Sequence, residues 1–186
     1  MPEARYLTAA ELEAGLDHIL ASPSDDGVLQ LIVRRPDVDA RETLETGSLD
    51  VEQGLVGDNW LERGSHHMPD GVADPDMQLN IMNARVAALV AGGTERIPFA
   101  GDQLYLDLDL SDENLPPGTR LAIGDALIEV TEPPHTGCRK FADRFGKDAV
   151  IFVNSDRGKA LNFRGINAKV VRSGAIHVGD VAKKSR

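Results

Sequence analysis

The sequence predicts a mainly β fold, a β-rich α+β chain that forms a closed or nearly closed β-barrel with a few peripheral helices. Many short apolar segments are separated by Gly and Pro turns, which is typical of such barrels. Residues 104–110 alternate strictly between apolar and polar side chains, as a half-buried strand does. The 186 residues carry no repeat or linker, so we expect a single domain over residues 1–186.

Three segments are expected to be helical. Thr8 and Glu11 form a capping-box pair, and leucine and isoleucine residues then recur at helical spacing, which predicts a helix over 9–21. Residues 84–91 form a second short helix before a Gly-Gly pair. Residues 139–145 can make one or two helical turns.

The strand candidates share apolar or alternating side chains between turn residues. Residues 61–75 are expected to be a surface loop, and 154–158 a turn whose side chains could reach a ligand. The strong strand candidates are 28–34, 77–81, 104–110, 120–123, 126–130, 150–153, 166–171 and 175–178, and the weaker ones are 43–45, 48–51 and 54–58.

Cys138 is the one cysteine of the chain and follows Pro-Pro-His-Thr-Gly at positions 133–137. A lone thiol is either a small buried hydrophobe or a reactive group. Arg139, Lys140 and Arg144 follow it, and cationic neighbours favour the thiolate, the nucleophilic and metal-binding form. The Pro and Gly residues place the thiol on a turn, where reactive groups are often found. The pattern therefore favours a reactive cysteine.

Charge and composition exclude some classes of partner. With 20 basic and 30 acidic residues the net charge is −10, and 4% of residues are aromatic, which argues against nucleic acid. The basic residues near Cys138 form a local positive site that suits a small anionic ligand. No apolar run is long enough for a membrane span, and the N-terminus lacks an apolar signal core, so we expect a cytoplasmic protein.

These residues resemble the MOSC domain, named for the C-terminal region of molybdenum cofactor sulfurases. The resemblance runs over about residues 97–180 and rests on four blocks that occur in the expected order. They are Arg-Leu-Ala-Ile-Gly-Asp-Ala-Leu-Ile-Glu-Val-Thr at 120–131, Pro-His-Thr-Gly-Cys-Arg-Lys-Phe at 134–141, Arg-Gly-Ile-Asn-Ala-Lys-Val-Val at 164–171 and Gly-Ala-Ile-His-Val-Gly-Asp at 174–180.

The resemblance implies a barrel of the pyruvate-kinase β-barrel type and a role for Cys138. In MOSC-like proteins the matching cysteine is proposed to carry sulfur as a persulfide or to bind molybdenum in the molybdenum cofactor, and both roles need an accessible thiolate. Molybdopterin ends in a phosphate, so the resemblance implies that cationic side chains bind it. The candidates are Arg139, Lys140, Arg144 and Arg164.

The sequence departs from the family pattern in two places. A Gly-Glu-Asn-Leu-like block reads Gly-Asp-Gln-Leu at 101–104, and a His-Gly-Gly segment is replaced by residues 65–71. Sites built on those segments are therefore expected to differ. No lysine lies in a recognisable pyridoxal-phosphate context, so we expect no such cofactor and no release of sulfur from cysteine by this chain alone.

Several polar side chains have both a chemical and a structural interpretation. His135 either exchanges protons with Cys138 or hydrogen-bonds the turn. His66 and His67 fit a solvated loop better than a zinc site with Cys138 and His135, because adjacent histidines in an extended segment point to opposite sides. The acidic residues, Asp107, Asp109, Asp112 and Glu113, fit a solvated strand face and loop better than an acid–base pair.

Three functions from different classes follow from these observations. The first is binding of molybdenum cofactor or carriage of sulfur at Cys138. A sulfur carrier would need a sulfur donor as its partner. The second is a molybdenum-cofactor-dependent reductase of N-hydroxylated compounds. Because no flavin, iron–sulfur or haem motif is present, such a reductase would need an electron-transfer protein. The third is a non-catalytic β-barrel that binds a small ligand and has an inert cysteine.

Overall fold

Seven strands close into a barrel in the order β11-β7-β8-β9-β5-β6-β1, because β1 pairs with β11. The computed structural model describes residues 5–65 and 68–185. Within this part the barrel ladders are antiparallel except for the parallel pair β5–β6. The barrel strands are β1 (Gly27–Arg34), β5 (Leu79–Asn83), β6 (Leu104–Asp107), β7 (Arg120–Ile123), β8 (Ala126–Val130), β9 (Ile166–Arg172) and β11 (Val181–Ser185).

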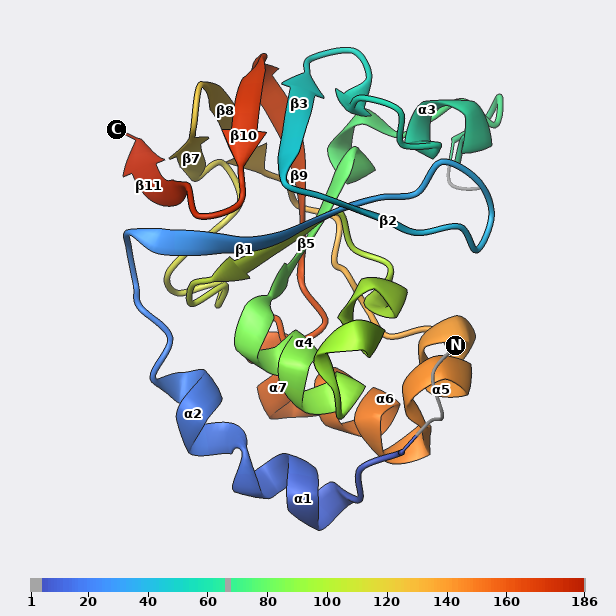
Figure 1. Cartoon of the computed structure of the whole chain (residues 1–186), viewed down its shortest axis with the longest axis vertical. Helices are drawn as coiled ribbons and strands as arrows, with labels where there is room; N and C mark the ends of the chain where they lie inside the picture. Colours follow the sequence, from blue (N-terminus) through green and yellow to red (C-terminus); the bar gives the residue numbers. More distant parts are fainter. Residues whose placement is uncertain (1–4, 66–67, 186) are drawn as a thin grey trace.

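The remaining strands extend the barrel. β2 (Glu42–Leu44) pairs with β1, and β10 (Gly174–His177), β3 (Thr46–Asp50) and β4 (Gly54–Leu55) form a small separate sheet. Figure 1 shows β3 and β10 on the upper side of the barrel.

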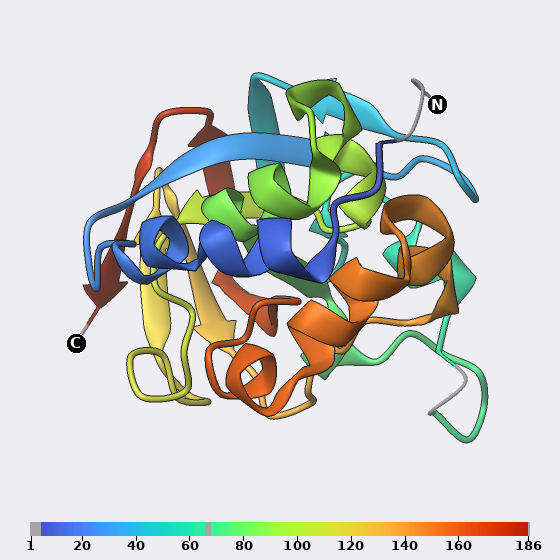
Figure 2. The ribbon, with the colours of Figure 1, turned by 90° about the horizontal axis from the view of Figure 1, so that it is seen from below.

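The helices gather on the opposite side of the barrel, and Figure 2 shows them in front of it when seen from below. α3 (Trp60–Arg63) lies apart from them. The other helices are α1 (Ala9–Ala14), α2 (Leu16–Leu20), α4 (Ala84–Ala91), α5 (Arg139–Phe145), α6 (Lys147–Asn154) and α7 (Asp156–Ala160), and 3-10 helices span Pro75–Met77 and Thr94–Ala100. Among the described residues no helix is long and apolar enough to cross a membrane.

Strand alternation divides the core in two. In β6, Leu104 and Leu106 point into the barrel, and Tyr105 between them packs in the layer under the helices. The same layer contains Leu12 and Phe141, so α1 and α5 are held against the outer wall of the barrel. The expectation that the strand over 104–110 is half-buried is therefore wrong at Tyr105, because helices cover this side chain. Asp107, on the same face as Tyr105, pairs with Arg85.

Most of the predicted strands are confirmed, but residues 150–153 are not a strand. Their β-branched and aromatic side chains favour strand conformation. They nevertheless belong to α6, in which Ala149 and Val153 are buried four residues apart and Ile151 is 55% exposed. This burial follows the helical period, so packing against α1 and α5 overrides local propensity.

Other boundaries differ in smaller ways. The helix over 9–21 is divided at Gly15, and the loop over 61–75 begins inside α3. The turn over 154–158 is a junction where Ser155 caps α7. The predicted strand over 104–110 ends at Asp107. β11 was not expected, because Ala182 is its one buried side chain, yet it closes the barrel.

Gly165, which connects Arg164 to β9, offers a test of this fold. Its φ is 117°, and a Cβ there would lie 2.3 Å from the Ile81 carbonyl oxygen. We expect Gly165→Ala to lower the free energy of unfolding by more than Gly118→Ala, since Gly118 has a φ of 89° but open space around it. At both positions an alanine in this backbone conformation should lower the free energy of unfolding by on the order of 1–3 kcal/mol. At Gly165 the clash with the Ile81 carbonyl should lower it further. Urea unfolding of both variants measures the difference, and equal losses would contradict the packing described here.

Candidate functional site

An irregular segment from Thr131 to Cys138 connects β8 to α5 and carries the cysteine. The backbone N–H of Thr131 donates to the carbonyl of Asn167, and the Asn167 side chain donates to the carbonyl of Pro133 at 2.9 Å. Cys138 is exposed and stands at the N-cap of α5. The thiol is therefore accessible, as the sequence predicted.

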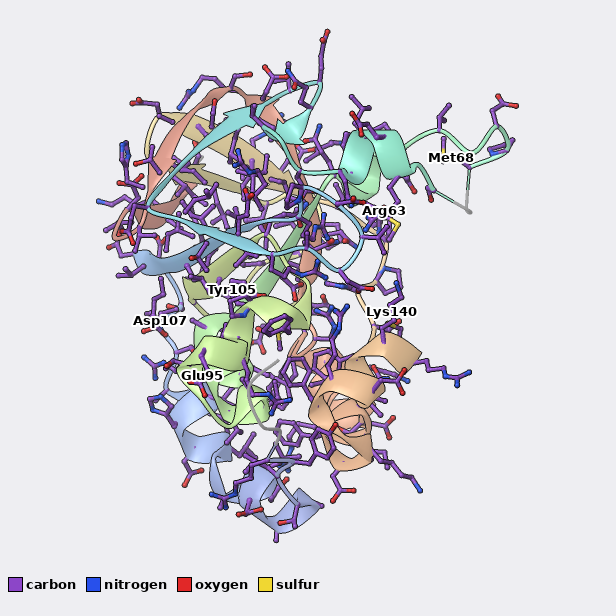
Figure 3. All side chains as sticks on the ribbon, turned by 45° about the vertical axis from the view of Figure 1, so that its right-hand side comes forward. Arg63, Met68, Glu95, Tyr105, Asp107 and Lys140 are labelled. Carbon is purple, nitrogen blue, oxygen red and sulfur yellow. The ribbon has the colours of Figure 1, made fainter. Side chains whose placement is uncertain are left out.

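Beside Cys138 lies a cavity of about 220 Å³ that is rich in cationic side chains. Figure 3 shows two of its lining residues on the same side of the molecule, Arg63 from α3 and Lys140 from α5. The cations that line it come from four separate parts of the chain, namely the β1–β2 connection, α3, α5 and the residue two before β9: Arg35, Arg41, Arg63, Lys140, Arg144 and Arg164.

Arg35 follows β1 and is buried in this wall with Asp58. Its Nε and Nη2 donate to the two carboxylate oxygens of Asp58, each at 2.8 Å. Its Nη1 donates to the side-chain oxygen of Asn80 at 2.9 Å, and Asn80 donates to Asn167 at 2.7 Å. A buried polar chain thus runs from the end of β1 to the segment that carries Cys138.

Arg164 forms a second buried ion pair, with Asp102. Its Nη1 donates to both oxygens of this carboxylate, at 2.9 and 2.7 Å, and its Nη2 donates to the carbonyl of Ala100. The guanidinium also lies 4.9 Å from the ring centroid of Phe141. Burial raises the pKa of Asp102, and the charge of Arg164 opposes that rise. Asp102, which departs from the family pattern, therefore orients a lining arginine.

Two of the lining guanidinium groups, those of Arg41 and Arg63, have no carboxylate within 4.0 Å among the described residues. Burial lowers the pKa of Arg41, and the charges of Arg144 and Arg35 lower it further. Partial burial lowers the pKa of Arg63, and the positive charge of Arg35 lowers it further. By contrast, Arg144 donates to Asp39 at 2.7 Å. The cavity therefore holds more positive than negative charge.

Polar atoms without a partner are concentrated around this cavity. In the part of the chain that the structure describes, five buried side-chain atoms lack a hydrogen bond, and four of them belong to its lining. Buried polar groups in proteins are normally bonded, so a cluster of unpartnered ones makes this cavity the candidate binding site. The four are Nε of Arg41, Oδ1 of Asn59, Nδ1 of His135 and Nε of Arg164.

His135 lies between this cavity and two others. Its Nδ1 is 3.3 Å from Oδ1 of Asp102 but lacks the geometry of a hydrogen bond. Burial, and then the charges of Arg164 and Arg35, lower the pKa of His135 well below 6.5. The imidazole is therefore neutral near neutral pH.

The structure brings together most of the site residues selected from the sequence. His135, Cys138, Lys140, Arg144 and Arg164 line the cavity, whereas Arg139 is exposed and lies outside it. Sequence reasoning missed the cations and amides from the first half of the chain: Arg35, Arg41, Asn59, Arg63 and Asn80. A signal for the first of these was available, since Arg35 directly follows a predicted strand, where functional loops begin.

No zinc site is seen within the described ranges, where no group of three or more His, Cys, Asp or Glu side chains could hold a metal ion. The pair His66–His67 lies outside the described residues.

The lowered pKa of His135 predicts a dependence of stability on pH. As the pH falls below about 6.5, the unfolded state binds a proton at His135 that the folded state does not bind. The free energy of unfolding should therefore decrease, by up to about 1.4 kcal/mol per pH unit. His135→Gln should reduce this slope, measured by urea unfolding between about pH 6.5 and about pH 5. An equal reduction in a His18→Gln control, or no reduction in His135→Gln, would contradict the assignment to His135.

Comparisons with known proteins give the family. Similar solved structures include the YuaD protein from Bacillus subtilis, with a TM-score of 0.59, 17% identity, and coverage of 86% of this chain and 96% of that chain. YiiM from Escherichia coli has a TM-score of 0.56 and 19% identity, over 86% of this chain and 70% of that chain. YiiM from Geobacillus stearothermophilus has a TM-score of 0.51 and 16% identity, over 88% and 74%. At these identities the likeness shows the fold.

No curated protein sequence matches this chain. The sequence pattern of the MOSC domain matches residues 75–183, more than half of the chain, and this range contains Cys138, the barrel strands from β5 to β9 and the first part of β11. The chain therefore belongs to the MOSC domain family.

Proposed function

We propose that this protein binds molybdenum cofactor in the cationic cavity, with Cys138 as the sulfur ligand of molybdenum. The MOSC family is associated with molybdenum cofactor. The observation that carries the proposal is that, of the five unpartnered buried polar atoms among the described residues, four belong to side chains that line one cavity beside an exposed thiol.

The unpartnered atoms fit the chemistry of this cofactor. Nε of Arg41 and Nε of Arg164 are hydrogen-bond donors, whereas Oδ1 of Asn59 is an acceptor. A pterin ring with a phosphate tail offers both acceptors and donors, so it can satisfy both kinds of atom. A second cavity of about 150 Å³ shares Arg63, Asn80 and His135 with the first. Together the two spaces fall within the roughly 300–1,000 Å³ of small-molecule sites.

The excess of cations suits the phosphate. Arg35 and Arg164 are each engaged by a buried carboxylate, so they shape the wall. Arg41, Arg63 and Lys140 have no carboxylate within 4.0 Å among the described residues. Arg41 donates from Nη1 to the Ala40 carbonyl, but its Nε has no partner, so these side chains still offer N–H groups for charge-assisted hydrogen bonds. We assign the phosphate to these three side chains.

Cys138 and His135 supply the reactive groups of the chain. The exposed Cys138 can present a thiolate to a soft metal, as sulfur ligands do. When bound, the molybdenum centre would supply two-electron redox chemistry. His135 is neutral, and its Nδ1 has no hydrogen-bond partner among the described residues, so this nitrogen can donate to or accept from a bound ligand according to its tautomer. If the protein is a reductase, its electrons come from a partner protein.

Molybdenum content tests the assignment of Cys138. We expect wild-type protein to retain about one molybdenum per chain after anaerobic reconstitution with the cofactor, and Cys138→Ser to lose it. The substitution should change the free energy of unfolding by less than about 0.5 kcal/mol, because the side chain is exposed. Metal analysis gives the result. Absence of molybdenum from the wild-type protein would contradict the proposal. In that case, sulfane sulfur on Cys138 after treatment with polysulfide would indicate a sulfur carrier.

Cofactor affinity tests the assignment of the unpaired cations. Arg41→Ala and Arg63→Ala should each weaken binding by about 10- to 100-fold, because each removes charged hydrogen bonds. Arg157→Ala is the matched control, since Arg157 is exposed, pairs with Glu13 and lies outside the cavity. Lys140→Ala should weaken binding more than Arg139→Ala, because Lys140 lines the cavity and Arg139 does not. Equal affinities in all five variants would contradict a phosphate site here.

A further inference from the structure

The cysteine lies at the end of a segment without regular secondary structure. Between β8 and α5, residues 131–138 belong to no ladder or helix. Asn167 holds the start of this segment at Pro133, four positions before Gly137. A metal ligand must keep a defined position, so something must also fix the end of the segment.

Asn154, the last residue of α6, contacts Gly137 at both of its backbone polar groups. The N–H of Gly137 donates to Oδ1 of Asn154 at 2.8 Å. The Nδ2 of Asn154 donates to the carbonyl of Gly137 at 2.9 Å. The two bonds form a closed clamp, which we call the Asn154–Gly137 clamp. A primary amide supplies this donor–acceptor pair, and neither a carboxylate nor a hydroxyl reproduces it.

Close packing strengthens the clamp. A Cβ on Gly137 would lie 3.0 Å from Cγ2 of Val150 and 3.0 Å from Cγ2 of Val153, both on α6. Only glycine lets the segment approach α6 this closely without a shift of these side chains. On its other side, the Cys138 carbonyl accepts from the N–H groups of Phe141 and Ala142 at 3.0 and 3.1 Å. The backbone of Cys138 is thus fixed from both directions.

We propose that Asn154 is a positioning residue, which holds the Cys138 thiol at the mouth of the cationic cavity through the Asn154–Gly137 clamp. Asn154 does not line that cavity, so its action passes through Gly137. The inference rests on the proposed function for the identity of the ligand. The positioning itself can be measured without the cofactor.

The single cysteine provides a direct measurement. A nitroxide spin label attached at Cys138 reports on the mobility of this segment by its electron paramagnetic resonance line shape. Asn154→Ala should make the label clearly more mobile. Asn114→Ala is the matched control, because Asn114 also donates to two carbonyls, those of Ser24 and Asp109, but outside the cavity. An unchanged line shape in Asn154→Ala, or the same change in Asn114→Ala, would overturn the proposal.

Asn154→Asp adds a pH signature that a general packing role would not produce. A carboxylate can accept from the Gly137 N–H but repels its carbonyl oxygen, whereas a protonated carboxyl can also donate. The label should therefore become more ordered in Asn154→Asp as the pH falls from about 6 to about 3, through the ordinary pKa of an aspartic acid, about 3.9. Wild type and Asn154→Ala should show no such ordering, and ordering in all three would overturn the proposal.

Ligand retention completes the test. We expect Asn154→Ala to lower molybdenum retention about tenfold after reconstitution, and to leave unchanged the affinity for inorganic phosphate, which binds the cations without the thiol. Wild-type retention in Asn154→Ala, or weaker phosphate binding in it, would overturn the positioning role. If wild-type protein holds no molybdenum while the label still responds to Asn154→Ala, the proposed function fails and the positioning of Cys138 is supported.

Discussion

Buried positive charge is the constraint on which the site depends. A guanidinium removed from water must find carboxylate and carbonyl partners, and Arg35 and Arg164 do so with Asp58 and Asp102. Such pairs add little net stability, but leaving either partner alone is costly. Each arrangement therefore permits few alternatives, and the two pairs fix the walls of one cavity from chain segments that are far apart in sequence.

The barrel brings these segments together at one of its ends. β1 runs antiparallel to β6, so Arg35 after β1 comes close to Asp102 before β6. β5 runs parallel to β6, which places Asn80 near the same end. Hydrogen bonds join two further segments to this end: Arg164, before β9, donates to Asp102, and Asn167 of β9 accepts from Asn80 and donates to Pro133 in the Cys138 segment. Closure by β11 holds the barrel strands in this register.

Sequence reasoning succeeded where the signal is local. The capping box of α1, the alternating strands and the turn before Cys138 are each encoded within a few residues, and the structure contains all of them. It failed for α6, where burial of Ala149 and Val153 overrides strand propensity, and for β11, which has a single buried side chain. Arg41 and Arg63 could not be found, because only the closed barrel shows that they face Cys138.

The contrast between the whole protein and the cavity determines which ligands can reach the thiol. With a net charge of −10, the surface repels a long polyanion, whereas a small anion that enters the cavity meets unpaired guanidinium groups at short range. His135 is neutral near neutral pH and adds no charge to this balance, so the attraction for an anion comes from the arginine and lysine side chains. In the proposed function the cations bind the anionic ligand and Cys138 binds the metal, whereas the Asn154–Gly137 clamp lies outside the cavity and holds the thiol beside it.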